Sequence, residues 1–287
     1  MKVQEDLPVF YAKKSLGQNF LISEAIARKI AVASLVEGDC GAIEIGPAYG
    51  ALTKELAPLF KKVVAIEIDE QLILQLEHNL LQNNINNVKI IHGDILKQDL
   101  CKIIKEEFAN LNVVVAANLP YYISTPIIMN LLKPGLGIRA ATVMLQKELA
   151  ERFCAKPGTK NTGAISYPLW YYSRPKKLFN VPKGNFRPIP KVDSAVVKFD
   201  ILNVPAVKVM DENLFFALIR ESFKKRRKTL LNSLCVYLGL NKNEFSSILN
   251  ICGFDLQIRS EQLTLQNFAT LANLLVEELS IDFKKIS

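Results

Sequence analysis

The sequence predicts an α/β protein with a parallel, doubly wound sheet, helices on both faces of that sheet, and a small all-α C-terminal domain. Short apolar runs rich in valine and isoleucine recur through the first half, and segments with helical spacing separate them. Such alternation is built from right-handed βαβ crossovers, which give a parallel sheet. The loss of strand-like runs after about residue 201 predicts the separate helical domain.

The first strands and helices follow from these runs. Ser23 is a candidate N-cap for a helix that runs toward Leu35. Further along, three leucines four residues apart lie as on one face of a helix, which predicts a helix over Glu70–Gln82. The expected strands are Ala42–Ile45, Val63–Ile66, Val88–Ile91 and Val113–Ala117, and a second intervening helix is expected at Leu52–Leu59.

The later part of the chain is less regular. We expect strands at Ala141–Leu145, Lys176–Val181 and Val192–Asp200, and a helix at Lys147–Cys154. The segment Gly163–Tyr172 is compatible with a helix or a strand. Helical spacing then returns around Leu214–Phe223, Leu230–Leu240 and Phe268–Leu279, so we expect two domains, residues 1–204 and 205–287.

Composition and charge narrow the class of protein. No apolar stretch approaches the roughly 20 residues needed to span a bilayer. The N-terminus lacks the basic-then-apolar layout of a secretory signal, so we expect a soluble cytoplasmic protein without membrane partners. The five cysteines lack the spacing of a zinc site or a disulfide framework, which predicts reduced thiols and no metal. The net charge of +8 favours an acidic partner such as nucleic acid.

Polar residues follow the first three strands, at the edge where open parallel sheets bind ligands. The turn Glu44–Gly50 is similar to a glycine loop, but Ala48 occupies the central glycine of the GxGxxG register, which argues against NAD. Glu67 ends the second strand, where an acid can accept the hydroxyls of a ribose. Asp94 follows the third strand, where it can accept from an adenine amine. Each acid taken alone could be an exposed residue in an ordinary turn. Together with the incomplete glycine loop, however, the two acids favour a nucleoside-containing cofactor without phosphate groups, such as S-adenosylmethionine.

The fourth strand ends in the most informative stretch, Asn118–Ser124. An adenine amine is a poor nucleophile because its lone pair is delocalised into the ring, so a catalyst has to hold its two hydrogens with acceptors. The Asn118 side-chain oxygen and the Leu119 carbonyl can do this, and Tyr121 offers a face for base stacking. A sulfonium is already an activated methyl donor, so catalysis reduces to positioning. A proline turn with two buried tyrosines is the alternative, and it leaves Asn118 unexplained.

With these residues in view, the sequence resembles the ribosomal RNA adenine dimethyltransferase family, whose small-subunit members are the bacterial KsgA-type enzymes. The resemblance covers nearly the whole chain and is carried by Lys14–Leu21, Glu44–Pro47, Asn118–Tyr121, Met144–Glu148 and Pro190–Val197. It implies a Rossmann-like class I methyltransferase fold with a seven-stranded, mostly parallel sheet. It further implies a monomeric enzyme that uses S-adenosylmethionine to dimethylate N6 of two adjacent adenines near the 3′ end of 16S RNA within a pre-30S particle.

The resemblance also implies roles for individual residues. The expected cofactor site is Asn19, Leu21, Gly46, Glu67, Asp94 and Asn118. Asn118 and Leu119 are expected to orient the target amine, and Tyr121 and Phe186 to sandwich the target base. The family usually carries Gly where this chain has Ala48, and a non-glycine residue tolerates a positive φ poorly.

Five consecutive cations are expected to contact RNA phosphates: Lys224, Lys225, Arg226, Arg227 and Lys228. A solvated helix face or a nuclear localisation patch would show the same run. Three alternative functions stay open at this point. They are a large-subunit dimethyltransferase of the macrolide-resistance type, a non-catalytic RNA-binding assembly factor with the same fold, and an N6-adenine DNA methyltransferase.

Overall fold

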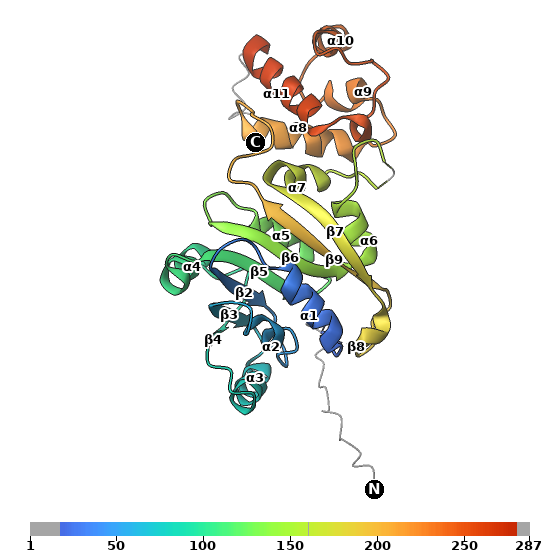
Figure 1. Ribbon diagram of the computed structural model, residues 1–287. Coiled ribbons are helices and arrows are strands. Elements are labelled where there is room, and N and C mark those ends of the chain that lie inside the picture. The colour runs from blue at the N-terminus through green and yellow to red at the C-terminus, as the bar shows by residue number, and fades with distance from the viewer. Residues whose placement is uncertain (1–17, 160, 280–287) are drawn as a thin grey trace. The chain divides into compact units, whose positions relative to one another are not determined.

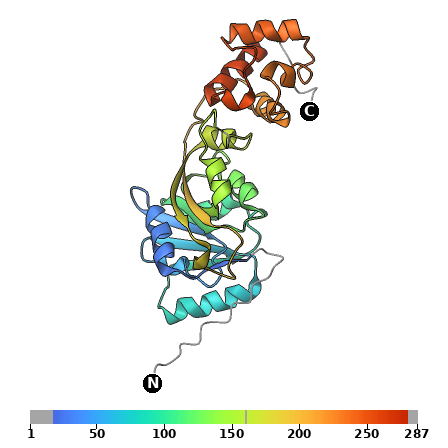
Figure 2. The ribbon, with the colours of Figure 1, turned by 90° about the vertical axis from the view of Figure 1, so that its right-hand side faces the viewer.

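The computed structural model describes residues 18–159 and 161–279, and its contacts divide the chain into two units (Figures 1 and 2). One unit extends to Ala150 and includes Pro175–Ile201, and the other comprises Glu151–Arg174 and the chain from Leu202 onward. No helix among the described residues has the length and apolar character needed to cross a membrane.

The first unit contains a seven-stranded sheet in the order β4-β3-β2-β5-β6-β9-β7. The strands are β2 (Cys40–Ile45), β3 (Lys62–Glu67), β4 (Val88–His92), β5 (Asn112–Asn118), β6 (Ile138–Gln146), β7 (Ser173–Val181) and β9 (Ser194–Ile201). Neighbours from β4 to β6 pair in parallel, and β9 pairs antiparallel with β6. This confirms the predicted mostly parallel, seven-stranded α/β fold.

The helices of this unit are α1 (Glu24–Ala33), α2 (Thr53–Leu56), α3 (Glu70–Gln82), α4 (Leu100–Phe108) and α5 (Ser124–Leu131), and α6 (Lys147–Phe153) begins in it and ends in the other unit. Helix α1 begins at the predicted cap, since Ser23 Oγ accepts from the Ile26 amide at 3.4 Å. Helix α1 lies in front of the sheet and α5 behind it (Figure 1). The pair α4 and α5 was not predicted, and neither were the two-residue strands β1 (Phe20–Leu21) and β8 (Phe186–Arg187), which pair antiparallel.

The second unit is helical, with α7 (Ser166–Tyr172), α8 (Glu212–Lys224), α9 (Leu230–Leu234), α10 (Lys242–Ile251) and α11 (Leu265–Leu279). Short 3-10 turns lie at Lys183–Asn185 in the first unit and Ser260–Gln262 in the second. The ambiguous segment before Tyr172 is therefore a helix over its second half. Helix α10 was not predicted.

Buried tyrosines explain why residues 151–174 group with the C-terminal helices, although the expected first domain ran to residue 204. Tyr167 is fully buried, and its hydroxyl donates to the carbonyls of Ser260 and Leu263 at 3.1 and 2.8 Å. Tyr171 and Tyr172 of the same helix both donate to the Glu212 carboxylate. Burying these rings against α8 and α11 excludes a large apolar area from water.

Candidate functional site

A cavity that is open to solvent lies at the carboxyl ends of β2 to β5, the usual place for a ligand in such a sheet. It is lined by all six residues expected to bind the cofactor, Asn19, Leu21, Gly46, Glu67, Asp94 and Asn118, and also by Leu119 and Tyr121. Parallel pairing collects these distant positions at one edge of the sheet. Residues 14–17 of the Lys14–Leu21 motif lie outside the described residues.

The loop after β2 requires left-handed backbone at alternate positions. Gly46, Ala48 and Gly50 have φ of +67°, +50° and +86°. An added Cβ at Gly50 would lie 2.7 Å from Leu76 Cδ1, so any other residue there would also have to displace the Leu76 side chain. The Ala48 amide donates to Glu67 Oε2 at 3.1 Å, which ties the loop to the end of β3. Ala48 therefore holds a conformation that costs an alanine about 1 to 2 kcal/mol.

Replacing Ala48 by glycine tests this strain. We expect Ala48→Gly to raise the free energy of unfolding by about 0.5 to 1 kcal/mol, because relief of the left-handed strain exceeds the added entropy of the unfolded chain. Urea denaturation followed by circular dichroism measures the change. Ala51→Gly, in the same loop without a positive φ, serves as the matched control and should destabilise. Equal losses in both variants would contradict strain at Ala48.

Glu67 is 4% exposed and is held by three backbone amides. Oε1 accepts from Ile68 and Asp69 at 2.9 Å each, and Oε2 accepts from Ala48. Burial raises the pKa of Glu67 above its ordinary value, while these three amides act in the opposite direction. Two donors fill Oε1, so Oε2 has a lone pair left for a ligand hydroxyl.

Asp94 is fixed by its own turn. Its Oδ1 accepts from the Leu96 amide at 3.0 Å, and the preceding Gly93 amide donates to the Glu67 carbonyl at 2.8 Å. The buried Ile95 lines the cavity beside it. The carboxylate is thereby held over the end of β4, with Oδ2 able to accept from a ligand amine.

In the turn after β5, hydrogen bonds to the rest of the protein hold the side-chain amide and the backbone in one orientation. The Asn118 Nδ2 donates one of its N–H groups to the Asn19 carbonyl at 3.1 Å, which orients the amide and leaves Oδ1 as its acceptor for a ligand. The Leu119 amide donates to the Met144 carbonyl at 3.3 Å. The Pro120 carbonyl accepts from the Ser124 hydroxyl at 2.8 Å, which closes the turn.

Tyr121 is anchored at its hydroxyl, 2.7 Å from Ser194 Oγ on β9. Burial raises the pKa of Tyr121, so the phenol stays protonated at neutral pH. The position of its ring is fixed by a hydrogen bond at its far end, which leaves the faces of the ring for packing.

Phe186 lies apart from the other residues expected in the site. Its side chain is 1% exposed and packs in the apolar core, and it does not line the cavity. The physical reason is that the Phe186 backbone pairs with Leu21 in the β1–β8 ladder. In this structure Phe186 offers no open face to a base.

The cavity is lined by carboxyl groups without basic side chains beside them in the described part of the chain. Glu44, Glu67 and Asp94 line it, and no lysine, arginine or histidine does so within residues 18–159 and 161–279. A phosphate would meet only like charge there, whereas a cationic ligand would be attracted. Sequence reasoning did not single out Glu44, although it opens the motif Glu44–Pro47.

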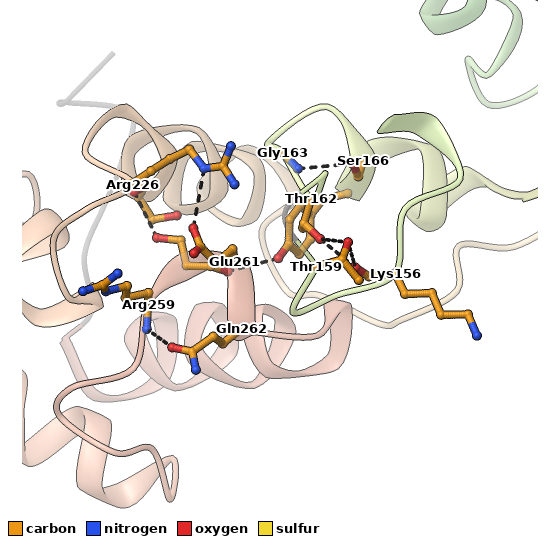
Figure 3. Close-up of polar contacts among 12 residues, drawn as sticks. Lys156, Thr159, Thr162, Gly163, Ser166, Arg226, Arg259, Glu261 and Gln262 are labelled. Atoms are coloured by element: carbon orange, nitrogen blue, oxygen red, sulfur yellow. Dashed lines mark hydrogen bonds and ion pairs between the residues drawn. The ribbon is translucent and has the colours of Figure 1, made fainter. Parts of the chain in front are cut away.

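The five cations of the basic run are all exposed in the second unit. Lys224 pairs with Glu221 at 2.8 Å, and Arg226 Nε lies 3.5 Å from Glu261 Oε2. Figure 3 shows Arg226 turned toward Glu261. Lys225, Arg227 and Lys228 have no acidic partner within 4 Å in the described part of the chain, so they are the cations available to a ligand.

Comparisons with known proteins agree with this geometry. A family model described as ribosomal RNA adenine dimethylase matches residues 9–276. The chain is 49% identical to ribosomal RNA small subunit methyltransferase A of Geobacillus thermodenitrificans, with 93% of this chain and 92% of that protein covered. The corresponding protein of Alkaliphilus oremlandii is 46% identical, with 94% of each covered.

Two solved structures are similar over most of the chain. A dimethyladenosine transferase from Plasmodium falciparum has a TM-score of 0.73 and 29% identity, covering 93% of this chain and 98% of that one. The 23S rRNA methyltransferase ErmE has a TM-score of 0.69 and 21% identity, covering 90% and 99%, and this likeness concerns the fold alone.

Proposed function

Since the chain belongs to the ribosomal RNA adenine dimethylase family, we propose that it transfers methyl groups from S-adenosylmethionine to N6 of two adjacent adenines near the 3′ end of small-subunit rRNA. The chain is an rRNA adenine methyltransferase by family. One observation supports the finer proposal: an acidic cavity ends at a turn where the Asn118 amide is oriented by a bond from Nδ2 to the protein, with Oδ1 as its acceptor for a substrate.

The residues of the cavity fit this cofactor. Strand order places the ends of β4, β3, β2 and β5 side by side, so Asp94, Glu67, the Gly46 loop and Asn118 follow one another along the edge. Asp94 would accept from the adenine amine and Glu67 Oε2 from the ribose, which leaves β2 for the amino acid end. S-adenosylmethionine supplies a methyl group activated by a sulfonium, and its positive charge suits a cavity lined by carboxyls.

Asn118 and Leu119 would act on the other substrate. Asn118 Oδ1 and the Leu119 carbonyl are two acceptors on adjacent residues, so they can hold both hydrogens of one amine and direct its lone pair. Tyr121, anchored by Ser194, would stack against the base. No general base lies in this scheme, because the proton can leave after the transfer.

The basic run would supply affinity for the RNA backbone. We expect the triple variant Lys225→Gln, Arg227→Gln, Lys228→Gln to weaken binding of a 16S RNA fragment and to lower the slope of log affinity against log salt by about 2 to 3, one unit for each lost phosphate contact. Filter binding across a salt series measures both. Lys97→Gln, Lys102→Gln, Lys105→Gln removes the same charge from exposed positions of the first unit. An equal loss in both triples would contradict a specific role for the run.

The substrate is tested by labelling. The protein with tritiated S-adenosylmethionine should methylate small-subunit particles purified from a strain that lacks this activity. We further propose that the substrate is a pre-30S particle, that the enzyme acts in the cytoplasm, and that it is monomeric. Labelling confined to free large-subunit RNA would favour a macrolide-resistance type, labelling of duplex DNA a DNA methyltransferase, and no labelling a binding factor.

A further inference from the structure

Glu44 is a buried acid with an unused oxygen. It lies near the end of β2, is 1% exposed, and lines the cavity. Its Oε2 has no hydrogen-bond partner within the described part of the chain. Buried polar atoms are almost always paired, so an unpaired carboxyl oxygen beside a ligand cavity calls for a ligand or a water as its partner.

The protein surrounds Glu44 with groups that disfavour its charge. In the sheet its neighbours are Ala65 on β3 and Ala116 on β5, both apolar. From α2, the Thr53 hydroxyl acts in the opposite direction and favours the charged form, although it is buried without a hydrogen bond of ordinary geometry. Burial raises the pKa of Glu44 to about 8, Thr53 offsets part of this rise, and the charge of Glu67 adds to it. Glu44 is therefore a neutral acid at pH 7 in the protein alone.

The other ionisable groups on the cavity wall give Glu44 no positive partner. They are Glu67 at the end of β3, Asp94 after β4, Tyr121 and Tyr122 after β5, and Tyr49 in the loop after β2. All are acids or phenols. A cation that ionises Glu44 must therefore come from the ligand, as far as residues 18–159 and 161–279 are concerned.

Strand order shows where that cation would lie. The adenosine part is expected over β4 and β3, at Asp94 and Glu67, while the reacting methyl group must face Asn118 on β5. The sulfonium and the amino acid end then lie over β2, the strand that carries Glu44. Both the sulfonium and the ammonium group of this end are positive.

We propose that Glu44 binds the cationic methionine end of the cofactor and releases one proton when it does so. The O–H bond of the carboxylic acid breaks, the proton passes to the solvent buffer, and the carboxylate formed pairs with the ammonium group. This proposal rests on the proposed function, because it takes S-adenosylmethionine as the ligand. It makes cofactor affinity rise with pH as Glu44 becomes easier to ionise.

Isothermal titration calorimetry tests the proton release directly. S-adenosylmethionine is titrated into the protein at pH 6.5 in phosphate and in imidazole, whose ionisation heats differ. At this pH the ligand's α-amine, with a pKa of about 7.7 to 8.0, is already charged and contributes little. We expect about one proton released per bound cofactor in the wild type. Binding without release overturns the proposal and leaves the proposed function intact, whereas absence of binding contradicts the proposed function.

Glu44→Gln keeps the shape of the side chain and removes its proton. It should bind with a proton count near zero and an affinity at least about tenfold lower, as expected for a lost charge-assisted contact. Glu55→Gln on α2, which does not line the cavity, is the matched control and should release as many protons as the wild type. Equal release by Glu44→Gln would assign the proton to another group and overturn the proposal.

A stability measurement checks the neutral state without any ligand. Between the ordinary value of 4.5 and about 8, folded Glu44 keeps its proton and the unfolded chain does not. The stability that this carboxyl contributes is therefore present at low pH and is lost as pH rises toward 8. We expect the melting temperature of Glu44→Gln, relative to wild type, to be higher at pH 8 than at pH 5. The same difference at both values would mean that Glu44 is already ionised.

Discussion

Asn118→Ala is expected to lower kcat for methyl transfer by about 100- to 1000-fold, the range found when one preorganised group that acts on the reacting atoms is removed. Binding of S-adenosylmethionine should be retained within about fivefold, because the remaining cavity residues carry most of the contacts with the cofactor. The physical reason is local. Asn118 Nδ2 is bound by the Asn19 carbonyl, so the side chain enters the reaction with its acceptor already oriented.

Single-turnover methylation of small-subunit particles, with cofactor affinity measured separately, distinguishes the two effects. Asn86→Ala makes the same change at an exposed position and should leave both quantities unaltered. Asn118→Asp gives a second test, since its carboxylate oxygen would face the Asn19 carbonyl and repel it. Turnover equal to the wild type in Asn118→Ala would remove Asn118 from the catalytic step.

Glu67→Ala is expected to weaken binding of S-adenosylmethionine by about 100-fold, which corresponds to about 2.7 kcal/mol and fits a lost hydrogen bond to a charged group. The variant loses the lone pair on Oε2. It also leaves three backbone amides, those of Ala48, Ile68 and Asp69, without their acceptor. The loop after β2 would lose its tie to β3, so the cofactor site would also be less preorganised.

Calorimetric titration of the cofactor measures this loss, and kcat at saturating cofactor should change far less than affinity. Glu70→Ala, at the exposed first turn of α3, is the control for removing a carboxylate nearby. An affinity within twofold of the wild type would show that the ribose is held elsewhere.

Much of the site was predictable because each of its parts is a local pattern. Gly46, Glu67 and Asn118 directly follow or end a strand and Asp94 lies two residues after one, and in a parallel sheet such positions share one edge. The sequence also indicated that Ala48 replaces a glycine at a position of positive φ, and Ala48 does have a positive φ in the structure.

Phe186 and Glu44 lay beyond that reasoning. The sequence places Phe186 only within a proline-rich connection, and its burial depends on the pairing of β8 with β1, whose residues lie far apart in the chain. The unpaired oxygen of Glu44 depends on which side chains α2 and β3 bring near it. Neither the burial of Phe186 nor the unpaired oxygen of Glu44 produces a repeating pattern in the sequence from which it could be predicted.

The sequence by itself determined the alternation of strands and helices, the positions of the strand ends and the family, because side-chain spacing and short motifs are properties of neighbouring residues. Only the tertiary structure decided which aromatic rings are buried, with which unit Tyr167 packs, and how Glu44 is protonated. These depend on contacts between distant segments, since burial and the electrostatic field at a group are set by everything packed around it.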